Sequence, residues 1–290
     1  MFPVIDSHQH IWDPARAEYD WLTSDLAPID RAIGMEEALP LLRAAGVERT
    51  ILVQSADNDD DTALMREAAD AHDEIVGIVG FAPLDDADAV EHTIASWSGD
   101  SRMVGIRNLI HNKRDPDWLL RDDVMAGLRV LQDAELTFDV VAVLPRHLEL
   151  VPLLSERLPH LRMVVDHLGK PPIGMSSRDP WWRLIAEAAA NPNVYGKVSG
   201  LYAGEGDSSS WTPDTVRPFF DRALEVFGAD RLMFGGDWPI SVLSGGYERL
   251  FGGLSEIFSS CDEESRERLL GRTAAEFYRI DPMRLAISRE

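Results

Sequence analysis

The chain has 290 residues, 45% of them hydrophobic, and its 50 acidic side chains outnumber 28 basic ones, which gives a net charge of −22. This length and apolar content are enough to bury a large core and argue against an intrinsically disordered chain. The negative charge argues against a nucleic-acid partner, because phosphate binding requires clustered lysine and arginine, and against an anionic membrane surface.

The sequence has no feature of a secreted or membrane-spanning protein. Its single cysteine, Cys261, cannot form a disulfide within the chain, which fits a reducing compartment. The first residues lack the basic start and long apolar core of a signal peptide. No uninterrupted apolar stretch approaches the roughly 18 residues that cross a bilayer. We expect a cytoplasmic protein that acts on a small molecule, and the sequence leaves its oligomeric state open.

Short β-branched runs recur along the chain, and most are followed by a segment of helical periodicity. The runs that we predict as strands begin near Val4, Arg49, Val76, Met103, Thr137, Arg162, Asn193 and Arg231. Amphipathic stretches predict helices over 60–72, 122–134, 146–158, 180–190 and 213–227. Strands separated by helices imply parallel pairing. Eight such units predict one distorted (β/α)8 TIM barrel, a single domain spanning residues 1–290.

Three further segments complete the predicted organisation. Residues 12–35 form the longest gap between elements, and we expect a long loop after the first strand. The stretch 204–210 is rich in glycine and serine and predicts a second, mobile loop. A helix over 262–277 would close the barrel.

Polar residues interrupt the apolar strands where each strand ends. The first strand contains His8 and His10, which share a face because alternate side chains point the same way. The sixth strand ends in His167 and the eighth in Asp237. A barrel places its active site at the C-terminal ends of its strands. We therefore expect these four side chains to meet at the barrel mouth, although each histidine alone could be a hydrogen-bonded structural residue.

Several blocks of the sequence resemble the amidohydrolase superfamily, and they cover residues 4 to about 280. They are Ile5-Asp-Ser-His-Gln-His-Ile-Trp-Asp-Pro14, Gly105-Ile-Arg107, Asp166-His-Leu-Gly-Lys-Pro171, Lys197-Val-Ser-Gly200 and Arg231-Leu-Met-Phe-Gly-Gly-Asp-Trp-Pro239. The blocks are most similar to the lactonase branch, which includes sugar lactonases and 2-pyrone-4,6-dicarboxylate lactonase. The resemblance implies a distorted barrel and hydrolysis of a small substrate.

The resemblance also shows which metal ligands are missing. Two-metal members carry a lysine on the fourth strand and a histidine on the fifth, whereas here the fourth strand ends in Arg107 and the fifth reads Phe138-Asp-Val-Val-Ala-Val143. A two-metal site is therefore not expected. One Zn²⁺ held by His8, His10 and Asp237 stays open. Imidazoles could instead polarise the substrate alone, and we expect that no cofactor is required.

Lactone hydrolysis assigns a role to each convergent residue. Asp237 would take a proton from water and return it to the departing ring oxygen; its alternative role is to orient a histidine. His8, His10 and His167 would stabilise the carbonyl oxygen as charge develops. Arg107 would bind substrate, unless it forms an ion pair with an acidic residue.

Further residues are candidates for substrate binding. Lys197 shares a face with Ser199 on the seventh strand, but the pattern does not say which face is inward. Aromatic residues predicted in loops above the mouth could pack against a sugar ring: Trp21, Tyr202 and Trp238, whereas Trp12 is expected in the core. Because Arg107 is the one arginine predicted in the pocket, a neutral sugar (aldono-) lactone is favoured over a dicarboxylate, which indicates carbohydrate catabolism.

Two other functions remain open at this point. Neighbouring amidohydrolase branches contain zinc-dependent non-oxidative decarboxylases of small carboxylic acids, with a similar set of histidines and aspartate. That function requires a bound metal. The second is a catalytically silent barrel that acts as a binding or scaffold protein.

Overall fold

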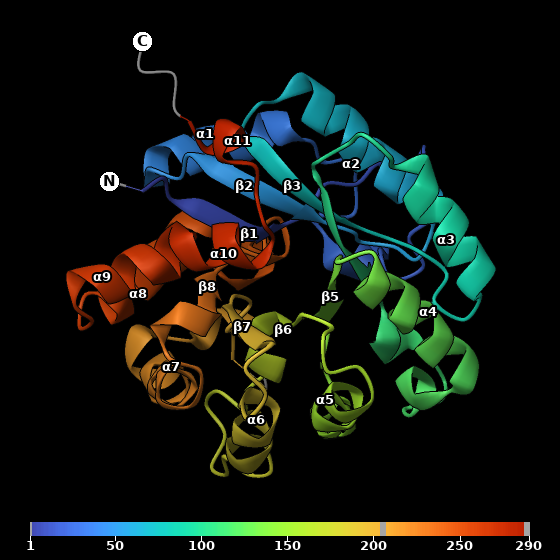
Figure 1. Cartoon of the computed structure of the whole chain (residues 1–290). Coiled ribbons are helices and arrows are strands. Elements are labelled where there is room, and N and C mark those ends of the chain that lie inside the picture. Colours follow the sequence, from blue (N-terminus) through green and yellow to red (C-terminus); the bar gives the residue numbers. More distant parts are fainter. Residues whose placement is uncertain (1, 204–206, 287–290) are drawn as a thin grey trace.

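The computed structural model describes residues 2–203 and 207–286, so part of the predicted mobile loop over 204–210 lies outside the described residues. Eight parallel strands pair in sequence order and form a nearly closed barrel (Figure 1). The strands are β1 Ile5–Gln9, β2 Arg49–Val53, β3 Ile75–Gly80, β4 Met103–Asn108, β5 Thr137–Val140, β6 Met163–Val165, β7 Val194–Val198 and β8 Leu232–Phe234. Each strand begins within one residue of its predicted start, and the predicted (β/α)8 architecture is confirmed.

Helices surround the strands on the outside of the barrel (Figure 1). They are α1 Met35–Ala45, α2 Asp59–Ala71, α3 Ala87–Ser96, α4 Asp122–Asp133, α5 Pro145–Arg157, α6 Trp181–Ala189, α7 Pro213–Phe227 and α8 Tyr247–Phe258. The five predicted helices are present with ends shifted by one residue at most. The pattern did not single out α1, α3 or α8. Pro40 in α1, and Gly252 and Gly253 in α8, weaken the helical signal. None of the helices in the described ranges is long and apolar enough to cross a bilayer.

The long segment that follows β1 is packed against the barrel. Trp12 and Ile33 form an isolated β-bridge across it, and the Trp12 indole donates to the carbonyls of Ile29 and Arg31. Trp12 is 1% exposed, as expected for a core residue. The Tyr19 hydroxyl is also buried against α2. The segment is therefore an ordered part of the wall around the mouth.

Hydrogen bonds between β1 and the end of β8 close the barrel at its mouth. The backbone N–H of Asp237 donates to the His8 carbonyl at 2.8 Å, and the N–H of His10 donates to the Trp238 carbonyl at 2.8 Å. Closure of the sheet therefore fixes the backbone of four predicted site residues relative to one another.

The C-terminal segment seals the opposite end of the barrel. The predicted helix over 262–277 is divided into α9 Glu263–Glu267, a π-helical turn Arg268–Arg272 and α10 Thr273–Phe277. It is interrupted at Gly271, where a Cβ atom would lie 2.3 Å from the Pro3 carbonyl oxygen. Residues of and after α10 pack against side chains inside the barrel, and a short α11, Pro282–Leu285, follows. This plug leaves the mouth as the accessible end for the site.

Candidate active site

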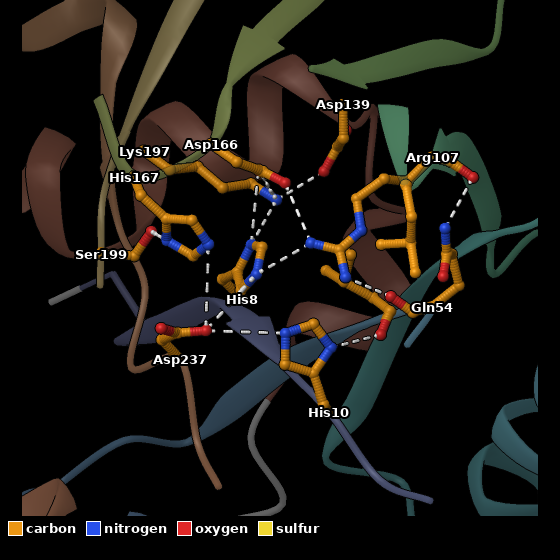
Figure 2. Close-up of polar contacts among 12 residues, drawn as sticks. His8, His10, Gln54, Arg107, Asp139, Asp166, His167, Lys197, Ser199 and Asp237 are labelled. Atoms are coloured by element: carbon orange, nitrogen blue, oxygen red, sulfur yellow. Dashed lines mark hydrogen bonds and ion pairs between the residues drawn. The ribbon is translucent and has the colours of Figure 1, made fainter. Parts of the chain in front are cut away.

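The structure brings the four convergent side chains together at the mouth (Figure 2). His8 lies in β1, His10 directly follows it, His167 lies in the turn η4 (Asp166–Gly169) after β6, and Asp237 follows β8. The Nε2 atoms of His8, His10 and His167 lie 3.8, 3.6 and 3.9 Å from Asp237 Oδ1. All four residues are buried. Three imidazole nitrogens therefore surround one carboxylate oxygen.

The backbone at two of these positions is strained. His167, Leu168 and Lys170 have left-handed φ values of 54°, 50° and 53°, and Asp237 has a φ of 49°. Left-handed backbone costs a non-glycine residue about 1–2 kcal/mol, and such strain concentrates at functional sites. The turn after β6 thereby directs His167 inward and places Lys170 over the mouth.

Each histidine is oriented by the nitrogen on its far side. His10 Nδ1 lies 2.7 Å from the Val53 carbonyl oxygen, and His167 Nδ1 lies 2.9 Å from Ser199 Oγ. Because a carbonyl can only accept, Nδ1 of neutral His10 carries the hydrogen and its Nε2 presents a lone pair to Asp237. Two acceptors that face each other at 3.6 Å need a proton, a water molecule or a cation between them. The centre of the cluster is thus built to hold such a species.

Burial controls the protonation of the cluster. Burial, with the charge of Lys197, holds the pKa of His8 well below its ordinary value, and burial lowers the pKa of His10. Burial, followed by the charge of Lys170, lowers the pKa of His167 to about 3. Burial alone would raise the pKa of Asp237, but its contacts with His167 and His10 and the charge of Lys170 outweigh burial and hold that pKa well below the ordinary range. At neutral pH the cluster is a carboxylate among neutral imidazoles.

Lys197 lies beneath the site, which corrects its predicted role in substrate binding. Its side chain points inward but is completely buried, with Nζ 2.5 Å from Asp139 Oδ2, 3.2 Å from Asp166 Oδ1 and 3.1 Å from His8 Nδ1 (Figure 2). The Tyr278 hydroxyl donates to the same oxygen of Asp139. Lys197 therefore acts on the site through His8 and cannot reach a ligand.

Arg107 lies at the cavity wall, and most of its N–H groups already donate to protein acceptors. Its Nη1 lies 3.1 Å from Asp166 Oδ2 and 3.3 Å from His8 Nε2, and its Nη2 donates to the Gln54 carbonyl. Its Nε has no hydrogen-bond partner in the described structure. The predicted substrate contact and the alternative ion pair are therefore both compatible with its position.

A cavity of about 220 Å³ opens above the cluster, bounded by polar site residues and an apolar wall. Its lining consists of His10, Trp12, Trp21, Ser55, Arg107, Leu109, His111, Val141, Val143, His167, Lys170, Asp237 and Ile240. A larger hollow of about 780 Å³ lies at the opposite end of the barrel, between residues 2–4 and the α9 region, but it contains no histidine. The smaller cavity is therefore the candidate substrate site, because His10, His167 and Asp237 line it.

The predicted aromatic contacts divide into three cases. Trp21 lines the cavity, and its indole donates to the Ser55 carbonyl at 2.7 Å. Trp238 is 3% exposed, packs in the core and does not line the cavity, so its predicted substrate contact is wrong. Tyr202 is half-buried and its hydroxyl lacks a partner among the described residues. Burial, followed by the charge of Asp237, raises the pKa of Tyr202.

The sequence analysis did not identify the buried residues that form ion pairs and hydrogen bonds with the site residues. Asp139 and Asp166 pair with the two buried cations, and Ser199 orients His167. A usable signal was present for Asp139, because a carboxylate between Phe138 and Val140 in an otherwise apolar strand must find a buried partner.

The cluster also fits one divalent metal ion. Ligand atoms of His8, His167 and Asp237 all lie within 4.8 Å of one another, so this set contains His167 in place of the predicted His10. Asp237 Oδ2 is buried without a partner in the described structure. The far-side nitrogens of the two histidines also have polar neighbours, since His8 Nδ1 lies 3.4 Å from Asp166 Oδ1 and His167 Nδ1 lies 2.9 Å from Ser199 Oγ, and such neighbours orient metal-bound histidines.

Histidines and an aspartate at the C-terminal ends of β1, β6 and β8 occupy the rim where TIM-barrel enzymes carry their active sites. The family model described as amidohydrolase matches residues 5–280. The chain belongs to the amidohydrolase family, in its lactonase branch.

Individual relatives agree with this assignment. The chain is 35% identical to an L-fucono-1,5-lactonase of Burkholderia ambifaria over 96% of each chain. It is 31% identical to an L-fucono-1,5-lactonase of Burkholderia multivorans over 95% of this chain and 96% of the relative. A crystal structure of an amidohydrolase from Burkholderia multivorans with bound zinc superposes with a TM-score of 0.87 at 29% identity, covering 96% of this chain and 100% of the other.

Proposed function

We propose that this protein hydrolyses a neutral sugar lactone to the corresponding aldonic acid. The observation that carries the proposal is the ionised Asp237, whose Oδ1 faces three imidazoles while its Oδ2 is buried without a partner in the described structure. A carboxylate in this state can accept a proton from water as that water attacks a carbonyl carbon. The similarity to L-fucono-1,5-lactonases supports the same reaction class.

The cavity supports a small, uncharged substrate. Its volume of about 220 Å³ lies below the range of about 300–1,000 Å³ of drug-sized pockets. Arg107 lines it, but its Nη atoms are bound to protein groups, so a dicarboxylate would lack a paired arginine site. Trp21 and the apolar residues Leu109 and Val141 offer flat and hydrocarbon surfaces to a sugar ring.

The chain's residues divide the reaction into steps. Asp237 and the lone pair of His10 Nε2 hold the attacking water by its hydrogens. In this proposal His10 contacts the water, whereas the sequence analysis placed it at the carbonyl oxygen. The water oxygen bonds to the carbonyl carbon, and its proton passes to Asp237. The ring C–O bond then breaks, and Asp237 returns the proton to the departing oxygen. A divalent ion held by His8, His167 and Asp237 would supply carbonyl polarisation and a lowered pKa of bound water when present.

A pH-indicator screen tests the proposal against a panel of five- and six-membered sugar lactones, with and without chelator. We expect turnover of at least one neutral aldonolactone and loss of about 10²-fold or more in kcat for Asp237→Asn. A near-wild-type rate in Asp237→Asn would exclude the base. No turnover of any lactone, together with metal-dependent CO2 release from a small carboxylic acid, would favour the decarboxylase alternative.

A further inference from the structure

Lys170 differs from the other two lysines of the chain because it forms no ion pair with any described residue. Only three of the 28 basic side chains are lysines. Lys197 is buried in ion pairs, and Lys113 pairs with Asp57 at 2.8 Å. Among the described residues, no acidic oxygen lies within 4.0 Å of the Lys170 ammonium. Its three N–H groups are free to bind something else.

Lys170 lies where a substrate would bind. It caps the strained turn η4 in left-handed conformation and lines the active-site cavity together with Asp237. Its Nζ lies 5.8 Å from the centre of the Tyr202 ring. The side chain is exposed at the mouth, and the negative charges of Asp237 and Asp166 counteract the lowering of its pKa. A cation is therefore held at the wall beside the base.

Among the other groups at the mouth, His10 and the Nη atoms of Arg107 are already engaged, whereas the Arg107 Nε–H has no partner in the described structure. Neutral His10 presents a lone pair and no hydrogen to the cavity, because its Nδ1–H donates to the Val53 carbonyl. Both Nη atoms of Arg107 donate to protein acceptors. Stabilisation of an oxyanion requires donors aimed at the oxygen that gains charge. The Lys170 ammonium lines the cavity and has no ion-pair partner among the described residues, so it can supply such a donor.

We propose that Lys170 is a further catalytic residue, whose ammonium donates a hydrogen bond to the substrate carbonyl oxygen as that oxygen becomes negative. The proposal rests on the proposed lactone hydrolysis. When the water oxygen bonds to the carbonyl carbon, the carbonyl electron pair moves onto the oxygen that Lys170 contacts. When this pair returns, the ring C–O bond breaks, and the departing oxygen takes the proton from Asp237.

The first test replaces the ammonium. Lys170→Met lowers kcat by about 10²–10³-fold, the effect of removing one oxyanion donor. KM for the lactone found in the screen changes much less, because the contact strengthens only in the transition state. Lys113→Met is the matched control: it removes another lysine near the mouth that does not line the cavity, and it keeps the wild-type kcat.

The second test restores the ammonium chemically and separates charge from folding. In a Cys261→Ser background the variant Lys170→Cys carries the only thiol of the chain. Alkylation with 2-bromoethylamine builds a lysine analogue at position 170, whereas iodoacetamide adds a neutral group to the same protein. We expect the amine to raise kcat at least tenfold over the thiol and the amide to leave it unchanged.

Each outcome decides the proposal. The role of Lys170 would be overturned if kcat of Lys170→Met lay within threefold of the wild-type value. It would also be overturned if the amine and the amide raised kcat equally. The lactonase function would stand in both cases. If the wild-type protein hydrolysed no lactone, the proposed function would be overturned. The lactone screen on the wild-type protein therefore comes before any variant is made. A folding defect of Lys170→Met is bypassed by the alkylation pair, since both products derive from one folded protein.

Discussion

Removal of the Lys197 ammonium tests the buried ion network beneath the active site. Lys197 and Arg107 together face Asp139 and Asp166, so two positive charges balance two negative charges in a region where no side chain is more than 5% exposed. Lys197→Met leaves one carboxylate without its cation. Breaking a buried pair on one side costs about 3–5 kcal/mol, because the remaining charge stays desolvated. We expect the free energy of unfolding to fall by this amount.

A double-mutant cycle separates pairing from lost packing. Asp139→Asn removes the partner charge but keeps an oxygen that can accept from the Tyr278 hydroxyl, which lies 2.8 Å from Asp139 Oδ2. The double variant Lys197→Met/Asp139→Asn should therefore lose less stability than the sum of the two single losses, with a coupling on the order of 2–3 kcal/mol. Urea unfolding at pH 7, followed by circular dichroism, gives all four free energies.

Lys113→Met is the control for this cycle, because Lys113 forms a half-exposed ion pair with Asp57 whose loss costs under about 1 kcal/mol. A loss for Lys197→Met no larger than that of the control, or strict additivity in the double variant, would refute the claim that these charges hold the floor of the site.

Two further predictions concern a glycine at the site and a buried carboxyl. Gly200→Ala places a Cβ atom 2.5 Å from His167 Nδ1 at a φ of +55°, and the resulting displacement of the imidazole should lower kcat by about 10²-fold. Gly99→Ala, at a φ of +87° with no atom within 4 Å, should cost stability only, so equal kinetic effects of the two variants would contradict this account. Burial raises the pKa of Asp61 from 3.8 to about 6, so the folded state binds this proton more tightly than the unfolded state, and wild type loses stability as the pH rises between these values. Asp61→Asn should remove about 3 kcal/mol of this pH dependence, and a free energy of unfolding that keeps the wild-type dependence on pH between about pH 3 and pH 7 would argue against it.

The sequence predicted the barrel and its convergent side chains because these depend on local patterns. Apolar runs of strand length, separated by amphipathic stretches, can pair in parallel only through helical crossovers. Polar residues that end such strands must then gather at one rim, which is why His8, His167 and Asp237 were found without coordinates.

The same patterns failed for Lys197 and Trp238, since strand position does not say how many neighbouring side chains cover a residue. Lys197 occupies an inward position that resembles a substrate contact, yet carboxylates from β5 and the turn after β6 enclose it. Trp238 directly follows Asp237 and packs in the core.

The amino-acid sequence by itself determined the architecture, the identity of the carboxylate and the imidazoles, and the family. Only the tertiary structure decided which cations are buried in ion pairs and which remain free, which nitrogen of His10 carries its hydrogen, and where Lys170 lies. These properties depend on partners brought from distant strands and on a left-handed turn, because burial, hydrogen bonding and charge pairing are set by all surrounding groups at once and not by neighbours along the chain.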